Sequence, residues 1–294
     1  MLEHLTTENR NNRTENLDQL SIDQFLTIMN EEDQKVALAV HEQIPAISNV
    51  VQIVIDSMRV GGRLIYVGAG TSGRIGLLDA VECPPTFGTN PNEVIGLIAG
   101  GNSAFIKAVE GAEDNVVLGK EDLAKQSLTK NDVVIGIAAS GRTPYVIGAL
   151  QYANEVGAKT VAIACNRNSE IGKVAKYQIE VDNGPEVLTG STRLKAGTSQ
   201  KLICNMISTA SMVGIGKVYK NLMVDLQLTN LKLIDRAKRI IIEATGCDYE
   251  TASEFLIEAK NETKVAIVMI LTGMNYDEAI NSLRKAEGFI SKIV

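Results

Sequence analysis

Residues 63–73 read RLIYVGAGTSG, a short apolar run that passes directly into a loop of glycines and hydroxyl residues. An apolar run without polar alternation is typical of a strand that is buried on both faces. The glycines that follow it indicate a tight turn that opens a helix. A buried strand, a tight turn and a helix in this order predict an α/β fold, so this stretch decides the fold class.

Four more strand-like runs follow the first one. They lie at 94–99, 132–138 and 159–164, with a weaker one at 177–181. Helical segments separate them, at 73–82, 103–126, 144–156 and 169–175. Buried strands that alternate with helices predict a parallel sheet covered on both faces, and we therefore expect a doubly wound sheet of five strands.

The segments on either side of the sheet region have helical patterns. Ser21–Gln24 reads as a capping box, and the apolar spacing over residues 44–58 predicts a core-facing helix that ends at Gly61 and Gly62. Residues 193–218 predict a long buried helix, and three shorter amphipathic patterns follow from about residue 236. We expect a main domain with N-terminal helices over residues 1–235 and a small C-terminal helical subdomain over residues 236–294.

The composition is that of a folded, acidic protein. Of the 294 residues 45% are hydrophobic, which is ample for a core. With 29 Lys and Arg against 35 Asp and Glu, a net charge of -6 and no basic run, we expect no nucleic-acid partner. The N-terminus lacks the apolar segment of a signal peptide, and no apolar run approaches the roughly 20 residues that span a bilayer. We therefore expect a cytoplasmic protein without a membrane partner.

Cysteine and histidine usage bears on metals and on catalysis. The four cysteines stand far apart without CxxC spacing, so the sequence indicates neither a zinc site nor a disulfide framework. The two histidines, His4 and His41, lie outside the glycine-rich motifs. We therefore expect no metal and no histidine-based triad, and carboxylates are the leading candidates for acid–base chemistry.

The loop Gly68–Gly73 matches the GxGxxG pattern of dinucleotide-binding folds. Those folds also use an acidic residue at the end of the second strand, where this chain has AGGN at 99–102. We therefore expect no nucleotide cofactor. The loop carries two hydroxyls instead, and a second strand-to-helix turn at 138–144, AASGRTP, has the same character.

Two such loops direct backbone N–H groups, hydroxyls and helix dipoles at one anion, which favours a small phosphate pocket. The candidate phosphate-binding residues are Gly70, Thr71, Ser72, Gly73, Ser140, Arg142 and Thr143. The alternative is that both loops are only capped turns between a strand and a helix, because capping by itself favours Ser and Thr.

A third polar cluster, TGSTRLKAGT at 189–198, opens the long buried helix. Its cations Arg193 and Lys195 fall in the first turn, where the helix dipole disfavours positive charge. An anionic ligand at this end would remove the conflict, so Ser191, Thr192 and Lys195 are further candidates for substrate binding. The alternative is that the two cations simply extend into solvent.

Glu82 is the first candidate for acid–base chemistry. It stands just before Pro84 and Pro85, which predict that the helix starting at residue 73 ends here. A carboxylate in the last turn faces the negative end of the helix dipole, and the prolines and Phe87 would partly bury it. Both effects disfavour the ionised form, and a general acid must stay protonated near neutrality. The alternative is a solvated glutamate in a poor location.

A second acidic cluster holds Glu110, Glu113 and Asp114. Glu110 and Glu113 are three residues apart and would share a helix face unless Gly111 interrupts the helix. The cluster follows the strand at 94–99, so at least one member could reach the cleft at the carboxyl ends of the strands. Two carboxylates in unlike environments form an acid–base pair. The alternative is a solvated acidic turn.

Taken together these motifs resemble one family. The runs are GAGTSGRIGLLDAVECPPTFG, GLIAGG, AVEGAED, GIAASGRTPYV and TGSTRLKAGTSQK, in this order. In sequence and spacing they are similar to those of the N-acetylmuramic acid 6-phosphate etherases, which have the sugar isomerase (SIS) fold. The likeness extends from about residue 10 to the C-terminus.

The resemblance implies a cytoplasmic, homodimeric lyase without a metal or another cofactor. Such an enzyme converts N-acetylmuramic acid 6-phosphate and water into N-acetylglucosamine 6-phosphate and D-lactate during cell-wall sugar recycling. The resemblance places the catalytic pair at Glu82 and Glu113, and the phosphate-binding hydroxyls at Thr71, Ser72, Ser140 and Thr143. In an elimination followed by water addition, we assign Glu82 as the acid at the lactyl oxygen and Glu113 as the base at carbon.

Two other functions remain open on the same fold. SIS domains also serve in sugar-phosphate-binding regulators, which need the hydroxyl loops but not the carboxylate pair. They also serve in sugar-phosphate isomerases, which use such loops with a glutamate that moves protons between adjacent carbons. An isomerase leaves the lactyl ether intact, so the products separate it from an etherase.

Overall fold

The structure is a computed structural model that describes residues 5–107 and 109–294. His4 lies outside the described residues. The chain folds into two compact units. The first, here the sheet unit, comprises the chain up to Val81 together with Asn92–Ser208, and the second, here the helical unit, comprises Glu82–Pro91 and Thr209–Val294. That residues 236–294 fold as a separate subdomain stays a prediction.

The sheet unit contains the five predicted parallel strands. They are β1 (Leu64–Gly68), β2 (Val94–Ile98), β3 (Val133–Ala138), β4 (Lys159–Ala164) and β5 (Tyr177–Glu180). Each end lies within one residue of the predicted end. The strand order is β2-β1-β3-β4-β5, and all neighbours are parallel. The chain thus moves outward from β1 in both directions, which confirms the doubly wound sheet.

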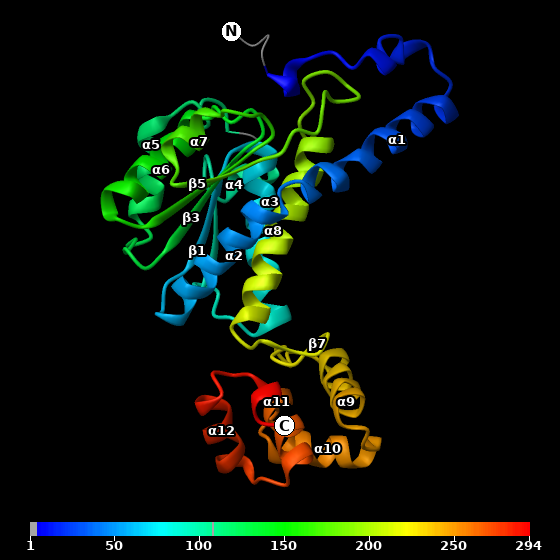
Figure 1. Cartoon of the computed structure of the whole chain (residues 1–294), viewed down its shortest axis with the longest axis vertical. Coiled ribbons are helices and arrows are strands. Elements are labelled where there is room, and N and C mark those ends of the chain that lie inside the picture. The colour runs from blue at the N-terminus through cyan, green and yellow to red at the C-terminus, as the bar shows by residue number, and fades with distance from the viewer. Residues whose placement is uncertain (1–4, 108) are drawn as a thin grey trace. The chain divides into compact units, whose positions relative to one another are not determined.

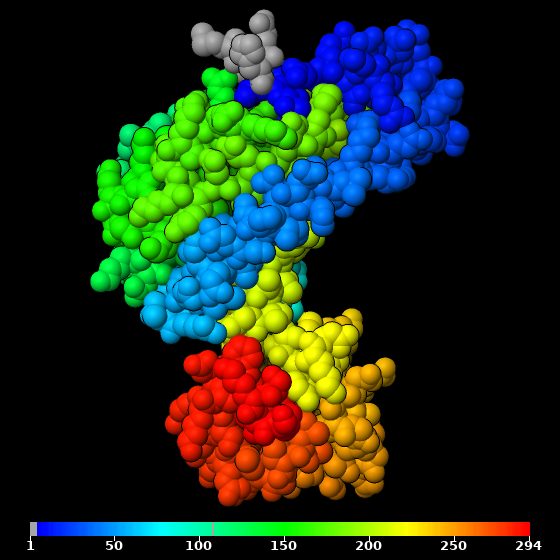
Figure 2. Space-filling model, viewed as in Figure 1, coloured from blue at the N-terminus to red at the C-terminus, as the bar shows by residue number. Residues whose placement is uncertain are grey.

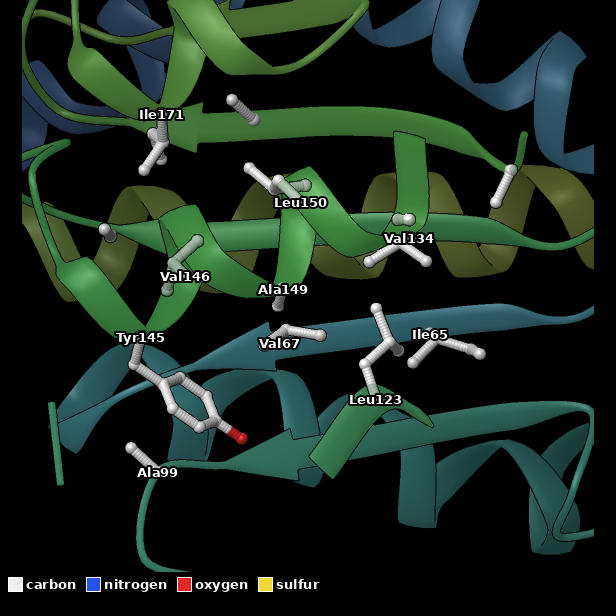
Figure 3. Packing of buried hydrophobic residues seen from close by; sticks show 14 of the residues in the cluster. Ile65, Val67, Ala99, Leu123, Val134, Tyr145, Val146, Ala149, Leu150 and Ile171 are labelled. Atoms are coloured by element: carbon white, nitrogen blue, oxygen red, sulfur yellow. The ribbon is translucent and has the colours of Figure 1, made fainter. Parts of the chain in front are cut away.

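Helices cover both faces of this sheet (Figure 1). One face carries α5 (Val116–Ala124), α6 (Pro144–Val156) and α7 (Glu170–Val174), and the other carries α2 (Ile44–Arg59), α3 (Gly70–Phe87) and α8 (Lys195–Gly214). On the first face, α6 lays Val146, Ala149 and Leu150 against Val67 of β1 and Val134 of β3 (Figure 3). All five side chains are fully buried, so this contact is the apolar core that fixes the sheet.

The N-terminal segment is helical as predicted. Three short 3-10 helices, Thr6–Glu8, Asn12–Thr14 and Leu17–Gln19, precede α1 (Ile22–His41). The capping box at Ser21 and Gln24 is confirmed, because each side chain bonds the backbone N–H of the other residue. Among the described helices none is by itself long and apolar enough to cross a membrane, although α1 and α2 pass that test jointly across a bend of 59°.

The predicted end of the helix at residue 82 is wrong, because α3 continues to Phe87 with Pro84 and Pro85 inside it. The prolines remove two N–H donors but do not stop the helix. Burial of Cys83 and Phe87 stabilises this last part, and Gly88, with φ of +62°, ends it. Packing of these buried side chains therefore outweighs the helix-breaking tendency of the two prolines.

The single helix expected at 103–126 is also wrong. The chain forms α4 (Ser103–Ile106) and α5, and residues 109–115 before α5 are in loop conformation. Gly111 in this loop has φ of +73°, a conformation that other residues rarely adopt. Glu110 and Glu113 therefore lie on a loop and not on one helix face.

The helical unit contains a short hairpin and four helices. The hairpin pairs β6 (Val218–Tyr219) with β7 (Leu222–Met223). The helices are α9 (Leu231–Thr245), α10 (Tyr249–Glu258), α11 (Thr263–Thr272) and α12 (Tyr276–Lys285), and the 3-10 helix Ile290–Lys292 follows. The sequence predicted three amphipathic helical patterns from about residue 236, whereas four helices form in this part of the chain. They enclose an apolar core of their own, and Figure 2 shows residues 209–294, yellow to red, closely packed.

Candidate functional site

Three loops leave the sheet side by side at its carboxyl edge. Gly68, the last residue of β1, is opposite Ile98 of β2 and Ile137 of β3. The loops that follow these strands, at 69–73, 99–115 and 139–143, therefore begin next to one another. The edge of a parallel sheet beside the strand where the order reverses is where such folds bind ligands.

The glycines of the first loop serve close packing between the strand and α3. A Cβ atom on Gly73 would lie 2.7 Å from the Gly68 carbonyl oxygen and 2.7 Å from Ile98 Cγ1. Gly70 has φ of +53°, and the space around it is open. The GxGxxG pattern thus lets a helix start directly on the strand, which leaves its first N–H groups at the sheet edge.

A cavity of about 300 Å³ opens between the first and second loops. Its lining includes Gly70 and Arg74 on one side and Glu110, Glu113 and Asp114 on the other. Arg74 donates hydrogen bonds to the carbonyl oxygens of Ala104 and Phe105, each at 2.8 Å, and so ties the second loop to α3. Sequence reasoning missed this role of Arg74, although the residue stands in a quoted run.

The backbone of Glu113 is tied to the start of α6. Its carbonyl oxygen accepts a hydrogen bond of 2.9 Å from the N–H of Tyr145, in the first turn of α6. This bond joins the second loop to the start of α6, two residues beyond Thr143. The structure therefore brings Glu113 together with Gly70 and with the third loop, while the Glu113 side chain stays exposed.

The hydroxyls of the first and third loops differ in their burial and in the hydrogen bonds that they make within the protein. Ser72 is buried and donates to Gln200 Oε1 at 3.0 Å, which holds the first loop against α8. Ser140 is half-buried, and its Oγ accepts from the Arg142 N–H at 3.3 Å. Thr143 precedes α6 and makes no side-chain capping bond within the described chain, so its hydroxyl is not used by the helix. Gln200 is a further positioning residue that the sequence did not single out.

The start of α8 meets the first loop. A Cβ atom on Gly197 would lie 3.4 Å from Thr71 Cγ2. Ser191 and Thr192 are half-buried just before this point. The three predicted polar clusters therefore lie within one unit, at one edge of the sheet.

Lys195 is buried and paired within the chain. It is 1% exposed, and its Nζ donates to Glu32 Oε2 and to the Asn183 carbonyl oxygen, each at 2.9 Å. The carboxylate of Glu186 accepts from the N–H groups of Lys195 and Ala196, also at 2.9 Å. For Lys195 the expected conflict with the helix dipole is thus resolved by Glu186 and Glu32 from the same chain. Arg193 is exposed and precedes α8, so it does not lie in the first turn as predicted.

Burial affects both of these carboxylates. It raises the pKa of Glu186, against the two backbone hydrogen bonds that lower it. Burial also raises the pKa of Glu32, but hydrogen bonds from Lys35, Lys195 and Arg13 outweigh it and bring this pKa down to about 2. Glu32 is therefore ionised in the folded protein at any ordinary pH.

The Glu32–Lys195 pair predicts an acid-sensitive contribution to stability. Replacing Glu32 by glutamine leaves the Lys195 ammonium buried without a counter-charge, which is expected to lower the free energy of unfolding at pH 7 by about 3 kcal/mol. Because the folded pKa of about 2 lies below the ordinary 4.5, the contribution is complete above pH 4.5 and is lost as the pH falls towards 2. Urea unfolding at several pH values measures it.

Glu31→Gln is the matched control for this prediction. Glu31 pairs with Arg13 at the surface and is half exposed, so its loss is expected to cost less than about 1 kcal/mol. An equal effect of the two substitutions, or a Glu32→Gln effect that persists at pH 2, would contradict the assignment.

Glu82 is the first residue of the helical unit. It is exposed, in the interior of α3, and it does not line the cavity beside Glu113. It stands twelve residues beyond Gly70 on the same helix, about three turns further on. The expected position in a last helical turn under Pro84 and Pro85 is therefore wrong, whereas Cys83 is buried as a packing residue.

No group of three or more His, Cys, Asp or Glu side chains that could hold a metal ion occurs within residues 5–107 and 109–294.

Several known proteins and protein families are similar to this chain. The glucokinase regulatory protein N-terminal SIS domain family matches residues 46–154, and the SIS domain family matches residues 113–210. A phosphoheptose isomerase from Francisella tularensis is 16% identical, with a TM-score of 0.49 over 66% of this chain and 100% of its own. The N-acetylmuramic acid 6-phosphate etherase of Bacillus cereus (strain 03BB102) is 62% identical over 99% of each chain.

That of Bacillus mycoides (strain KBAB4) is 63% identical over the same share of both chains. Each of these matches covers 99% of this chain, and so extends over both units. The chain belongs to the N-acetylmuramic acid 6-phosphate etherase family.

Proposed function

We propose that this chain is a carbon–oxygen lyase that cleaves the lactyl ether of N-acetylmuramic acid 6-phosphate. Water is consumed, and the products are N-acetylglucosamine 6-phosphate and D-lactate. The observation that carries the proposal is that Glu113 lines one cavity of the sheet unit with Gly70 of the first loop, while its carbonyl oxygen accepts from Tyr145 at the start of α6, in a chain of this family. No metal and no other cofactor takes part in the proposed reaction.

The sugar phosphate binds at the carboxyl edge of the sheet. Its phosphate takes hydrogen bonds from the loop that holds Gly70, Thr71, Ser72 and Gly73, where the N-terminus of α3 adds a favourable dipole. The third loop adds Ser140, Arg142 and Thr143, and the start of α8 adds Ser191 and Thr192. Lys195 does not contact the sugar phosphate in this proposal, because its ammonium is held by Glu32. It positions the start of α8 instead.

The reaction proceeds by elimination and water addition. In the open-chain sugar the aldehyde acidifies the C–H at C2, and Glu113 as base removes this proton. The C3–O bond then breaks, and the lactyl oxygen takes a proton from Glu82 to leave as lactate. The unsaturated aldehyde adds water at C3, with Glu82 as the base, and Glu113 returns a proton to C2.

The active species is proposed to be a homodimer, as the family resemblance implies. In this proposal the sugar beside Glu113 of one subunit meets Glu82 of the partner subunit. A cytoplasmic location is also part of the proposal.

Incubation with N-acetylmuramic acid 6-phosphate tests the function. We expect equimolar D-lactate and N-acetylglucosamine 6-phosphate, and one ¹⁸O from labelled water at C3 of the sugar. Binding of the sugar phosphate without any product would indicate a regulator. A rearranged sugar that still carries its lactyl ether would indicate an isomerase.

A further inference from the structure

The helical unit contains a second cavity, of about 510 Å³. This volume is in the range of small-molecule sites. None of the residues assigned above to catalysis or to sugar-phosphate binding lines it. Its charged lining residues are Lys217, Asp225, Glu262, Lys264 and Arg284.

More cationic than anionic side chains line the cavity. Lys264 Nζ donates to Asp225 Oδ2 at 2.6 Å and to the Gly216 carbonyl oxygen at 2.8 Å, which uses two of its three protons. Lys217 Nζ lies 3.4 Å from the same Asp225 oxygen. The Asp225 carboxylate thus pairs with both ammonium groups. Arg284 adds a third cation, and it forms no ion pair within the described parts of the chain.

Burial lowers the pKa of Lys264, against the raising effect of Asp225. The ammonium is therefore incompletely compensated by the groups around it. A second anion near this nitrogen would stabilise its charged form.

The first turn of α11 borders the same cavity. Its N-cap residue, Glu262, makes no side-chain capping bond in the described structure, because its carboxylate accepts from the Tyr276 hydroxyl at 2.7 Å. The N–H groups of residues 263–265 have no acceptor inside the helix. Thr263 is 2% exposed, lines the cavity, and its buried hydroxyl has no hydrogen-bond partner among the described residues. A buried hydroxyl without a partner is costly and indicates a missing group.

We propose that this cavity is a second ligand site, which binds a small molecule through a phosphate monoester at the N-terminus of α11. The Thr263 hydroxyl, the first N–H groups of α11 and the cations Lys264 and Arg284 hold the phosphate oxygens. An anion suits the site, since three cations line it against two carboxylates, Asp225 and Glu262, and Glu262 already accepts a hydrogen bond from Tyr276. Helix N–H groups with Lys and Arg are the usual protein partners of phosphate.

Titration of the full-length protein with inorganic phosphate, followed by ¹H–¹⁵N NMR, tests the proposal. We expect saturable shifts of the backbone N–H signals of residues 263–265. Arg284→Met is expected to weaken this binding at least about tenfold, because it removes a charge-assisted contact. Thr263→Val keeps the side-chain shape and is expected to weaken it about fivefold.

Arg239→Met is the matched control, because Arg239 is an exposed arginine of the same unit that pairs with Asp235 outside the cavity. It is expected to leave phosphate binding unchanged. The absence of saturable shifts at 263–265, or equal binding by Arg284→Met and wild type, would overturn the site. Equal saturation by acetate would overturn the phosphate assignment. Lactate release by Arg284→Met is expected at the wild-type rate, so this result is independent of the proposed reaction.

Discussion

Glu113→Gln is expected to lower kcat/KM for lactate release by about 10²–10⁴-fold, the usual loss when a general base is removed. Glutamine keeps the length of the side chain and cannot accept the proton from C2. The backbone bond from Tyr145 that holds residue 113 does not involve the side chain, so the fold is expected to stay intact. Steady-state assays of lactate release give the loss.

Exchange of the substrate's C2 proton with solvent deuterium tests whether Glu113 is the base at C2. In D₂O the wild type is expected to exchange the C2 proton of the substrate, whereas Glu113→Gln loses exchange and lactate release together. Glu110→Gln is the matched control, since Glu110 is an exposed carboxylate that lines the same cavity. Its expected loss is less than about tenfold. If Glu113→Gln exchanged the C2 proton at the wild-type rate, Glu113 would not be the base.

The parts of the fold that the sequence predicts are those fixed by local pattern. The strands are predicted to within one residue because runs such as LIYVG and VVIGIA are buried on both faces. The loop after β1 is predicted because Gly73 must approach Gly68 closely. Two hydroxyl loops were expected to converge on one anion, since the carboxyl ends of parallel strands share an edge.

The parts that the sequence does not predict depend on distant partners. Nothing near Lys195 in the sequence reveals that Glu32, 163 residues away, neutralises it. The continuation of α3 through two prolines depends on burial of Cys83 and Phe87, which only the folded chain provides. For the same reason the exposed position of Glu82 could not be read from its neighbours.

Glu82→Gln is expected to lower lactate release by about 10²–10⁴-fold while exchange of the C2 proton with solvent deuterium continues. The substitution removes the acid that protonates the lactyl oxygen and leaves Glu113, the base at C2, in place. Parallel measurement of exchange and lactate separates the two steps. Asp56→Asn is a control for loss of an exposed carboxylate on another helix and is expected to keep full activity. Loss of exchange with retained lactate release would reverse the two roles.

Mixing the two inactive variants tests which subunit supplies Glu82. In a mixed dimer of the proposed arrangement, Glu113 of the Glu82→Gln subunit would meet the intact Glu82 of the partner subunit, and the other site would lack both carboxylates. Random exchange makes half of the dimers mixed with one working site each, so about a quarter of the wild-type activity is expected. Subunits with two different affinity tags allow the mixed dimer to be isolated. A pure mixed dimer without activity would mean that Glu82 and Glu113 act from the same chain, because each subunit would then lack one member of its pair.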